Sequence, residues 1–214
     1  VQMTVEQIIV MLILMIVGVL CYKTHILDTS KSKVLSDILI KVITPALIID
    51  SFQRKFEMEL LHGFLIALGL TALSLGLAFV LTRLMIRENT STDVRIERFG
   101  AMFSNCGFIG IPLANGVLGG EGVFYIIAYN TLFNILVFSY GEGYMKGTSV
   151  YRLSDIIKLI INPATVASVI GIILFAGNIE LPELLSEPIG LVADMNTPTA
   201  MLIAGVSVAQ ANIL

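Results

Sequence analysis

The chain has 214 residues, of which 56% are hydrophobic and 14% are charged, and its formal net charge is −3. Its mean hydropathy of +0.91 is far higher than a soluble domain of this size requires, so the composition indicates an integral membrane protein. Two cysteines, each in an apolar run, argue against a disulfide framework or a metal site.

We expect seven membrane-spanning helices, because one crossing needs about 20 predominantly apolar residues. The first apolar run lacks the positively charged segment of a signal peptide, so we interpret it as a mature span. The second run is the least apolar, since Asp37, Lys41 and Pro45 interrupt it. The expected spans are Val5–Tyr22, Val34–Phe52, Leu60–Ile86, Phe99–Leu118, Val123–Met145, Ile156–Ala176 and Ile189–Leu214.

The fourth span carries residues that break a helix. Pro112 lacks a backbone N–H, and Gly107 and Gly110 weaken the helix before it. In hydrocarbon a break survives only where it is buried in protein or lines a cavity. The two half-helix ends then offer N–H groups to anions and carbonyl oxygens to cations, and Asn105 and Asn115 lie on either side of Pro112. The pattern predicts either a substrate-binding crossover or a kinked structural helix.

Lysine and arginine in the connections predict the orientation of the chain. The connections after the first, third and fifth spans hold ten of these residues, whereas those after the second, fourth and sixth spans hold only Arg54 and Lys55. Because basic loops stay on the cytoplasmic side, we expect a multi-pass protein of a bacterial-type inner (plasma) membrane with its N-terminus outside.

Two landmarks recur at a fixed distance along the chain. This distance of 153 residues leads from the first span to the sixth and from the second to the seventh, which implies a repeat of five spans. Because five is odd, the second copy enters the membrane upside down, as in the inverted repeats of secondary transporters. The two landmarks, each separated by 153 residues, are Gly18 with Gly171 and Thr44-Pro45 with Thr197-Pro198.

Three strings and one carboxylate are similar to those of a known family. They are Asn105-Cys-Gly-Phe-Ile-Gly-Ile-Pro-Leu113, Gly119-Gly-Glu-Gly122, Ile161-Asn-Pro-Ala-Thr-Val-Ala-Ser-Val-Ile-Gly171, and Asp194 in the seventh span. In these residues, and over essentially its whole length, the chain resembles the auxin efflux carrier family. That family includes the plant PIN-FORMED carriers and bacterial permeases proposed for malate and malonate.

The resemblance implies a ten-span carrier of organic anions with two inverted five-span repeats and a crossover formed by the fourth and ninth spans. It also implies dimers and a transport domain that moves against a scaffold in an elevator-like way. Residues 1–145 would then be the first repeat, with scaffold spans at 5–52 and transport spans at 60–145. A cytoplasmic linker at 146–155 and the start of the inverted second repeat at 156–214 would follow. Because spans eight to ten are lacking, we expect a fragment of a longer carrier.

Polar residues in other spans complete the candidate substrate site. Asn130 and Asn134 are four residues apart in the fifth span, so both project from one face of a helix. They are expected either to line a cavity or to form hydrogen bonds between helices, a normal use of Asn in membranes. Thr44 and Pro45 in the second span either flank the substrate at the interface between scaffold and transport domain or only bend the helix.

Two residues are candidates for coupling transport to a proton or a cation. Asp194 is a carboxylate in the seventh span, and intramembrane carboxylates are coupling candidates by default; near the end of a span it can also be a hydrated structural group. His62, at the outer start of the third span, can titrate near neutral pH or can simply be solvated.

Motifs of other function classes are missing from the sequence. It holds no P-loop, no Cys-x-x-Cys, no His-Glu-x-x-His and no Gly-x-Ser-x-Gly, so we expect no enzyme activity, cofactor, metal or nucleic-acid partner. We therefore expect a secondary carrier of small organic anions, such as auxin-like acids or dicarboxylates, that forms homodimers or higher homo-oligomers in the bilayer. The alternative is a seven-span sensor or scaffold that binds a small ligand without transport.

Overall fold

The computed structural model describes residues 2–87, 92–104, 106–141, 144 and 162–211. All regular secondary structure in this part of the chain is helical, which confirms the expected all-helical class. The α-helices are α1 (Gln2–Lys23), α2 (Thr29–Ile38), α3 (Thr44–Ser51), α4 (Met58–Met85), α5 (Thr92–Met102), α6 (Ile111–Leu136), α9 (Pro163–Ala176), α10 (Glu183–Asp194) and α11 (Asn196–Gln210), and the π-helical turns are η1 (Leu39–Ile43), η2 (Cys106–Gly110) and η3 (Val137–Gly141).

Four described helical segments are long and apolar enough to cross a membrane. They correspond to the first and third expected spans, to a run that holds the end of the fourth and most of the fifth, and to the seventh. The second expected span is the continuous run formed by α2, η1 and α3. The sixth expected span contains α9, and the first residues of that span, 156–161, lie outside the described residues. The four long segments are Val5–Lys23, Met58–Met85, Ile111–Leu136 and Glu183–Gln210.

The seventh span begins before the position that hydropathy predicted. Its first helix starts at Glu183 rather than at Ile189, and Pro188 lies inside that helix. Glu183 is in the first turn, where a carboxylate interacts favourably with the unpaired N–H groups of the helix. The expected span, Ile189–Leu214, left this acidic, proline-containing stretch outside the helix, and that prediction was wrong.

The fourth span is broken, as expected, but the break is not at Pro112. Helix α5 ends at Met102, Phe103 and Ser104 lie in no helix, and helical structure is present again from Cys106. Pro112 lies in the first turn of α6, directly after η2. The prediction that the proline itself ends a half-helix was therefore wrong.

A π-helical turn explains how the helix continues through the proline. Proline in a regular α-helix clashes with the carbonyl four residues earlier and removes one N–H donor. In this chain η1 comes directly before Thr44-Pro45, and η2 comes directly before Ile111-Pro112. The wider turn relaxes the spacing between the ring and the preceding carbonyls, so each helix is bent rather than ended.

Gly119 forms the turn between the fourth and fifth spans. Its φ of 64° and ψ of −156° are not helical, although the residues on both sides of it belong to α6. Residues with a side chain rarely adopt this conformation, which is accessible to glycine. Element α6 therefore contains two helices: the end of the fourth span and most of the fifth.

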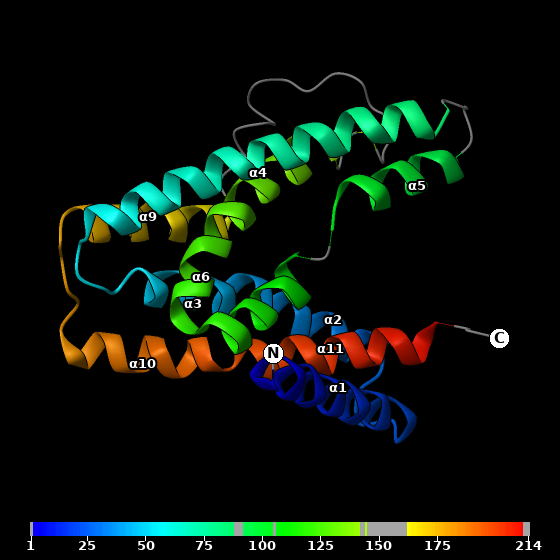
Figure 1. Ribbon diagram of the computed structural model, residues 1–214. Coiled ribbons are helices and arrows are strands. Elements are labelled where there is room, and N and C mark those ends of the chain that lie inside the picture. Colours follow the sequence, from blue (N-terminus) through cyan, green and yellow to red (C-terminus); the bar gives the residue numbers. More distant parts are fainter. Residues whose placement is uncertain (1, 88–91, 105, 142–143, 145–161, 212–214) are drawn as a thin grey trace.

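Two groups of helices face each other in the molecule. Figure 1 shows α10 and α11 nearly end to end on one side, with α1 beside α11, and α4, α5 and α9 on the other side. Element α6 crosses between the two groups. The most extensive packing joins α1 with α11, α4 with α6, and α3 with both α9 and α10.

Two glycines allow α1 and α11 to pack backbone against backbone. A Cβ atom added to Gly18 would overlap the carbonyl oxygen of Leu202, and one added to Gly205 would overlap that of Met15. Small residues at such crossings are the usual means by which membrane helices approach closely. In the same way, Gly171 of α9 packs directly against the ring of Phe52.

A cluster of phenylalanines fixes one end of the bundle. Phe52, Phe64, Phe124 and Phe175 come from the ends of the second, third, fifth and sixth spans, and each is at most 5% exposed. Their ring centroids lie 5.2 to 6.3 Å apart, mostly in edge-on or tilted pairs. Such pairs contribute about 0.5–1.5 kcal/mol each beyond burial. This end is therefore firmly packed.

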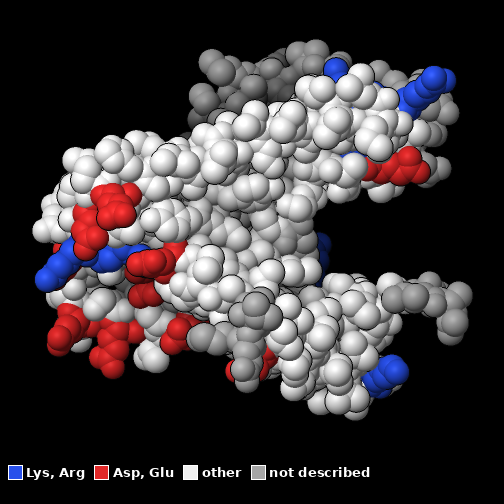
Figure 2. Space-filling model, viewed as in Figure 1, with Lys and Arg blue, Asp and Glu red and all other residues white. Residues whose placement is uncertain are grey.

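Charged side chains gather at the ends of the helices. Figure 2 shows acidic side chains over the end of the molecule where α4 and α10 begin. Glu59 and Glu183 lie in the first turns of these helices, and Lys23 and Arg83 lie in the last turns of α1 and α4. Between these charged ends, the surfaces of α1 and α4 are covered by exposed apolar side chains, as expected for surfaces in contact with lipid.

The packing of α1 against α11 leads to a first prediction. We expect Gly18→Ala to lower the free energy of unfolding by about 1–3 kcal/mol, because the new methyl group meets a backbone carbonyl that cannot rotate away. The matched control is Gly69→Ala in α4, where an added Cβ meets no atom within 4 Å. There the same change should be neutral or stabilising by up to about 1 kcal/mol.

Thermal unfolding of the purified variants in one detergent measures both effects. Equal melting temperatures for the Gly18 and Gly69 variants would contradict the close contact between α1 and α11.

Candidate functional site

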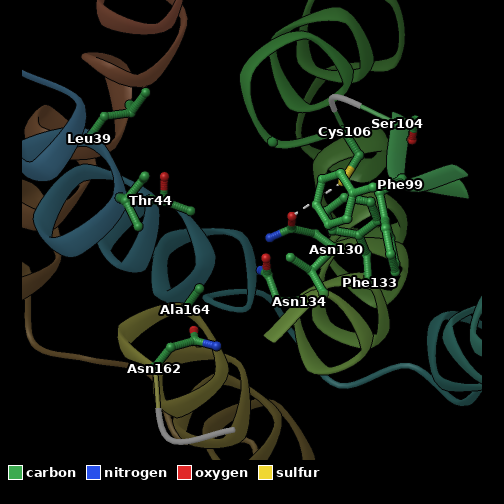
Figure 3. Close-up of a pocket in the computed structure, with 14 residues that line it drawn as sticks. Leu39, Thr44, Phe99, Ser104, Cys106, Asn130, Phe133, Asn134, Asn162 and Ala164 are labelled. Atoms are coloured by element: carbon green, nitrogen blue, oxygen red, sulfur yellow. Dashed lines mark hydrogen bonds between the residues drawn. The ribbon is translucent and has the colours of Figure 1, made fainter. Parts of the chain in front are cut away.

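A cavity of about 290 Å³ lies where the bent second span, the broken fourth span, α6 and the start of α9 meet. None of its lining residues is charged. Figure 3 shows the labelled side chains converging from these separate elements. The lining residues are Leu39, Ile40, Thr44, Phe99, Phe103, Ser104, Cys106, Gly107, Asn130, Phe133, Asn134, Val137, Asn162 and Ala164.

Asn130 and Asn134 form the polar wall that α6 contributes. They lie one turn apart, and Figure 3 shows both amide groups on the side of the cavity that faces Thr44. Asn130 is only 3% exposed, and its Oδ1 accepts a weak hydrogen bond from the Cys106 thiol at 3.7 Å. The shared face expected from their spacing is present in the structure, and substrate binding by these two residues stays a prediction.

Thr44 forms the opposite polar wall at the bend of the second span. It directly follows η1, and its Oγ1 accepts a hydrogen bond from Asn196 Nδ2 at 3.5 Å. Asn196 lies at the bend of the seventh span, so the two bent spans contact each other beside the cavity. Pro45 belongs to the first turn of α3 and is not among the lining residues.

The structure divides the residues expected around the crossover. Gly107 lines the cavity, and a Cβ atom added to it would lie 3.9 Å from Asn130 Oδ1. Gly110 borders an adjacent shallow hollow, and Pro112 is buried in the core. Asn115 lies on an exposed face of α6 away from the lining residues, and Asn105 lies outside the described residues.

The two coupling candidates lie apart from the cavity. Asp194 is exposed at the last residue of α10, in the middle of the long seventh segment rather than near a span end as predicted. It is close enough to Asp50 of α3 for the two carboxylates to interact electrostatically. His62 is exposed in the first turns of α4.

Arg54 holds the turn at Gly119 from outside the spans. Its Nη2 donates to the carbonyl oxygen of Gly120 at 2.9 Å, its Nε donates to that of Ser51 at 2.8 Å, and its guanidinium carbon lies 5.0 Å from the ring centroid of Phe124. Burial lowers the pKa of Arg54, while Glu121 beside it acts in the opposite direction. The guanidinium stays protonated at physiological pH because an Arg pKa is so high. One cation thus ties the end of the second span to the start of the fifth.

Sequence reasoning missed several lining residues. Asn162 was not predicted as a site residue, although an Asn followed by Pro before an apolar run is the usual signal for the start of a helix. Phe99, Phe103 and Phe133 form an aromatic side of the cavity, with ring centroids 5.0 and 5.7 Å apart in successive pairs. Apolar residues in an apolar span give no signal that distinguishes a lining position from a lipid-facing one.

Other candidate sites are less suited to a polar ligand. A second cavity, of about 510 Å³ between α4, the end of α5 and the later part of α6, is lined almost wholly by apolar side chains. Within the described part of the chain, no group of three or more His, Cys, Asp or Glu residues is arranged to hold a metal ion.

Comparisons with known proteins match the whole chain. A family model described as a membrane transport protein matches residues 3–153 and 146–213. A relative from Methanocaldococcus jannaschii, described as an uncharacterized transporter, is 24% identical over 218 residues, which cover 94% of this chain and 68% of that protein.

The open cavity predicts a pattern of cysteine reactivity. In a chain whose own cysteines are replaced by Ala, Asn134→Cys should react with a small methanethiosulfonate reagent, because this position lines the cavity. Ser168→Cys is the control, since Ser168 is 1% exposed and hydrogen-bonded to Thr131 at 2.8 Å. Mass spectrometry of timed reactions measures both rates. Equal rates at the two positions would contradict the presence of the cavity.

Proposed function

Because the chain belongs to the membrane transport protein family that includes the auxin efflux carriers, we propose that it is a secondary carrier of small organic anions that binds its substrate in the cavity beside the broken fourth span. The observation that carries the proposal is the buried amide of Asn130. Its Oδ1 is engaged by Cys106, which leaves its Nδ2 hydrogens directed to the cavity as donors. Donors in a site without acidic side chains favour an acceptor of negative charge.

The position of the cavity suits alternating access. Thr44 belongs to the proposed scaffold spans, whereas Asn130, Asn134 and Gly107 belong to the proposed transport spans. A substrate held there touches both parts, so a movement of one part against the other would carry it between the two sides of the membrane. The shape and extent of the crossover in the fourth span depend on Gly110, Pro112, Asn105 and Asn115. The bend of the second span depends on Pro45.

The inverted repeat is supported by how its equivalent helices pack. Helix α1 packs on α11 through Gly18 and Gly205, and α9 packs on the end of the second span through Gly171 and Phe52. An offset of 153 converts Gly18 to Gly171 and Phe52 to Gly205, so it exchanges one contact for the other. Two copies related by a two-fold axis in the membrane plane have this property. This supports a first repeat at 1–145, a linker at 146–155 and a second repeat from 156.

The distribution of charge supports an orientation with the N-terminus outside. The acidic end of the molecule, where α4 and α10 begin, would face outward, and the ends of α1 and α4 with Lys23 and Arg83 would face the cytoplasm of a plasma membrane. The exposed scaffold helix α1 offers a face for a homodimer. Asp194, together with its neighbour Asp50, and His62 are the groups proposed to couple substrate movement to a proton or a cation.

Binding and uptake by proteoliposomes test the proposal. The chain should bind at least one anion from a panel of dicarboxylates and indole-3-acetate, and a carrier that contains this chain together with the expected spans eight to ten should accumulate that anion. Asn130→Ala should weaken binding by about tenfold or more, since a hydrogen bond to a charged ligand contributes about 1.5–3 kcal/mol. The control is Ser74→Ala on the exposed face of α4, which should leave binding unchanged.

The outcomes separate the two candidate functions. Binding that depends on Asn130, without uptake by the ten-span carrier, would favour the sensor over the carrier. If Asn130→Ala leaves the binding affinity unchanged, the ligand site lies elsewhere.

A further inference from the structure

The second cavity, beside α4, is an apolar hollow on a surface that faces lipid. Its volume is about 510 Å³, and none of its lining residues is charged. Ala72 and Gly76, which line it from α4, are exposed, and so are the neighbouring side chains of Leu73 and Leu77. The hollow therefore opens on the side of α4 that contacts the bilayer. Because an empty hollow forfeits van der Waals contacts, an apolar chain from the bilayer would stabilise it.

The row of lining residues on α4 leads to a cation. Ala72, Leu75 and Phe79 follow one another at intervals of three and four residues, so they share one face of the helix. Arg83 extends that face by one further turn. Its guanidinium carbon lies 4.6 Å from the ring centroid of Phe79, and its Nη2 donates a hydrogen bond to the Tyr140 hydroxyl at 3.4 Å. Since Phe79 and Tyr140 both line the cavity, the cation lies at the end of the cavity nearest the last turn of α4.

A second arginine braces this end from inside the protein. Arg98 of α5 is 4% exposed, and its Nε and Nη2 both donate to the carbonyl oxygen of Ile86. Its Nη1 donates to the hydroxyl of Tyr144, whose ring stacks on that of Tyr140 with centroids 5.6 Å apart. Figure 2 shows basic side chains, with acidic ones beside them, where α4 ends. Arg83 is exposed, so it is accessible to a charged group at the membrane surface.

We propose that this cavity binds an acyl chain of an anionic phospholipid and that Arg83 holds the phosphate of the same lipid. Arginine pairs with phosphate through charge-assisted hydrogen bonds, and basic pockets between spanning helices bind anionic headgroups. A phospholipid supplies an apolar chain and a negative charge in one molecule, which match the apolar cavity and the cation at its end. The inference needs only a membrane location and does not rest on the proposed carrier function. The site shares Phe103 with the first cavity, so a bound chain packs against one wall of the proposed substrate site.

The headgroup is tested by native mass spectrometry of the purified chain. The chain in detergent is titrated with phosphatidylglycerol and, separately, with phosphatidylcholine that carries the same acyl chains. Arg83→Gln removes the charge, and Arg83→Lys keeps it. The control is Lys23→Gln, which removes a positive charge from the last turn of α1, away from the cavity.

The acyl chain is tested by filling the cavity. A Cβ atom added to Gly76 or to Gly69 meets no atom within 4 Å, but Gly76 lines the cavity and Gly69 does not. Gly76→Leu therefore places a side chain in the space of the acyl chain, and Gly69→Leu is the matched control on the same helix. Both variants should keep at least the melting temperature of the parent chain, because Leu is a better helix former than Gly.

The parent chain should bind phosphatidylglycerol about fivefold more tightly than phosphatidylcholine, the difference expected for one arginine near the membrane surface. Arg83→Gln should abolish this preference, whereas Arg83→Lys should retain most of it. Gly76→Leu should weaken binding of both lipids. The Lys23 and Gly69 variants should bind as the parent chain does.

Three results would overturn the proposal. The first is equal affinity of the parent chain for the two lipids, or a preference that survives Arg83→Gln. The second is equal lipid binding by Gly76→Leu and Gly69→Leu, which would place the acyl chain elsewhere. The third is a loss of dimers in Gly76→Leu without any change in lipid binding, which would assign the cavity to a second copy of the chain. If Gly76→Leu does not fold, the Arg83 variants still decide the outcome.

Discussion

Backbone groups have no water to bond with inside a bilayer, and the arrangement of this chain depends on that constraint. Every place where a spanning helix is bent or interrupted must find other partners for its N–H and carbonyl groups. The π-helical turns η1 and η2, the non-helical Phe103 and Ser104, and the capped start of α9 are all such places, and all of them meet at one cavity. The irregular backbone therefore gathers where protein surrounds it, while the regular helices α1 and α4 carry the apolar surface.

The rest of the packing holds these irregular segments in place. Backbone contact through Gly18 and Gly205 joins the first span to the end of the seventh, and the phenylalanine cluster around Phe124 joins the second, third, fifth and sixth spans at one end. Arg54 adds a polar tie between the second span and the turn at Gly119. The cavity lies away from these contacts, since none of the residues that form them lines it.

Hydropathy and helix-breaking residues were sufficient to predict the class of fold, most of the spans and the existence of a break in the fourth. They could not locate the break, because a π-helical turn before Pro112 lets the helix pass through the proline, and no simple sequence rule distinguishes the two outcomes. The start of the seventh span was misplaced because Glu183 and Pro188 fit a helix start as well as a loop. Thr44, Gly107, Asn130 and Asn134 line the cavity, but Asn115 does not, since its position on α6 depends on the bend that was misplaced.

We propose that an organic anion binds where α6, the broken fourth span and the start of α9 meet. Photoaffinity labelling with a diazirine-bearing aryl carboxylate, followed by mass spectrometric mapping of the modified residues, tests this location most directly. We predict labels within 99–107, 130–137 and 162–164 that disappear when an unmodified carboxylate competes. Competed labels confined to the apolar cavity beside α4, or to the acidic end of the molecule, would show that the anion binds elsewhere.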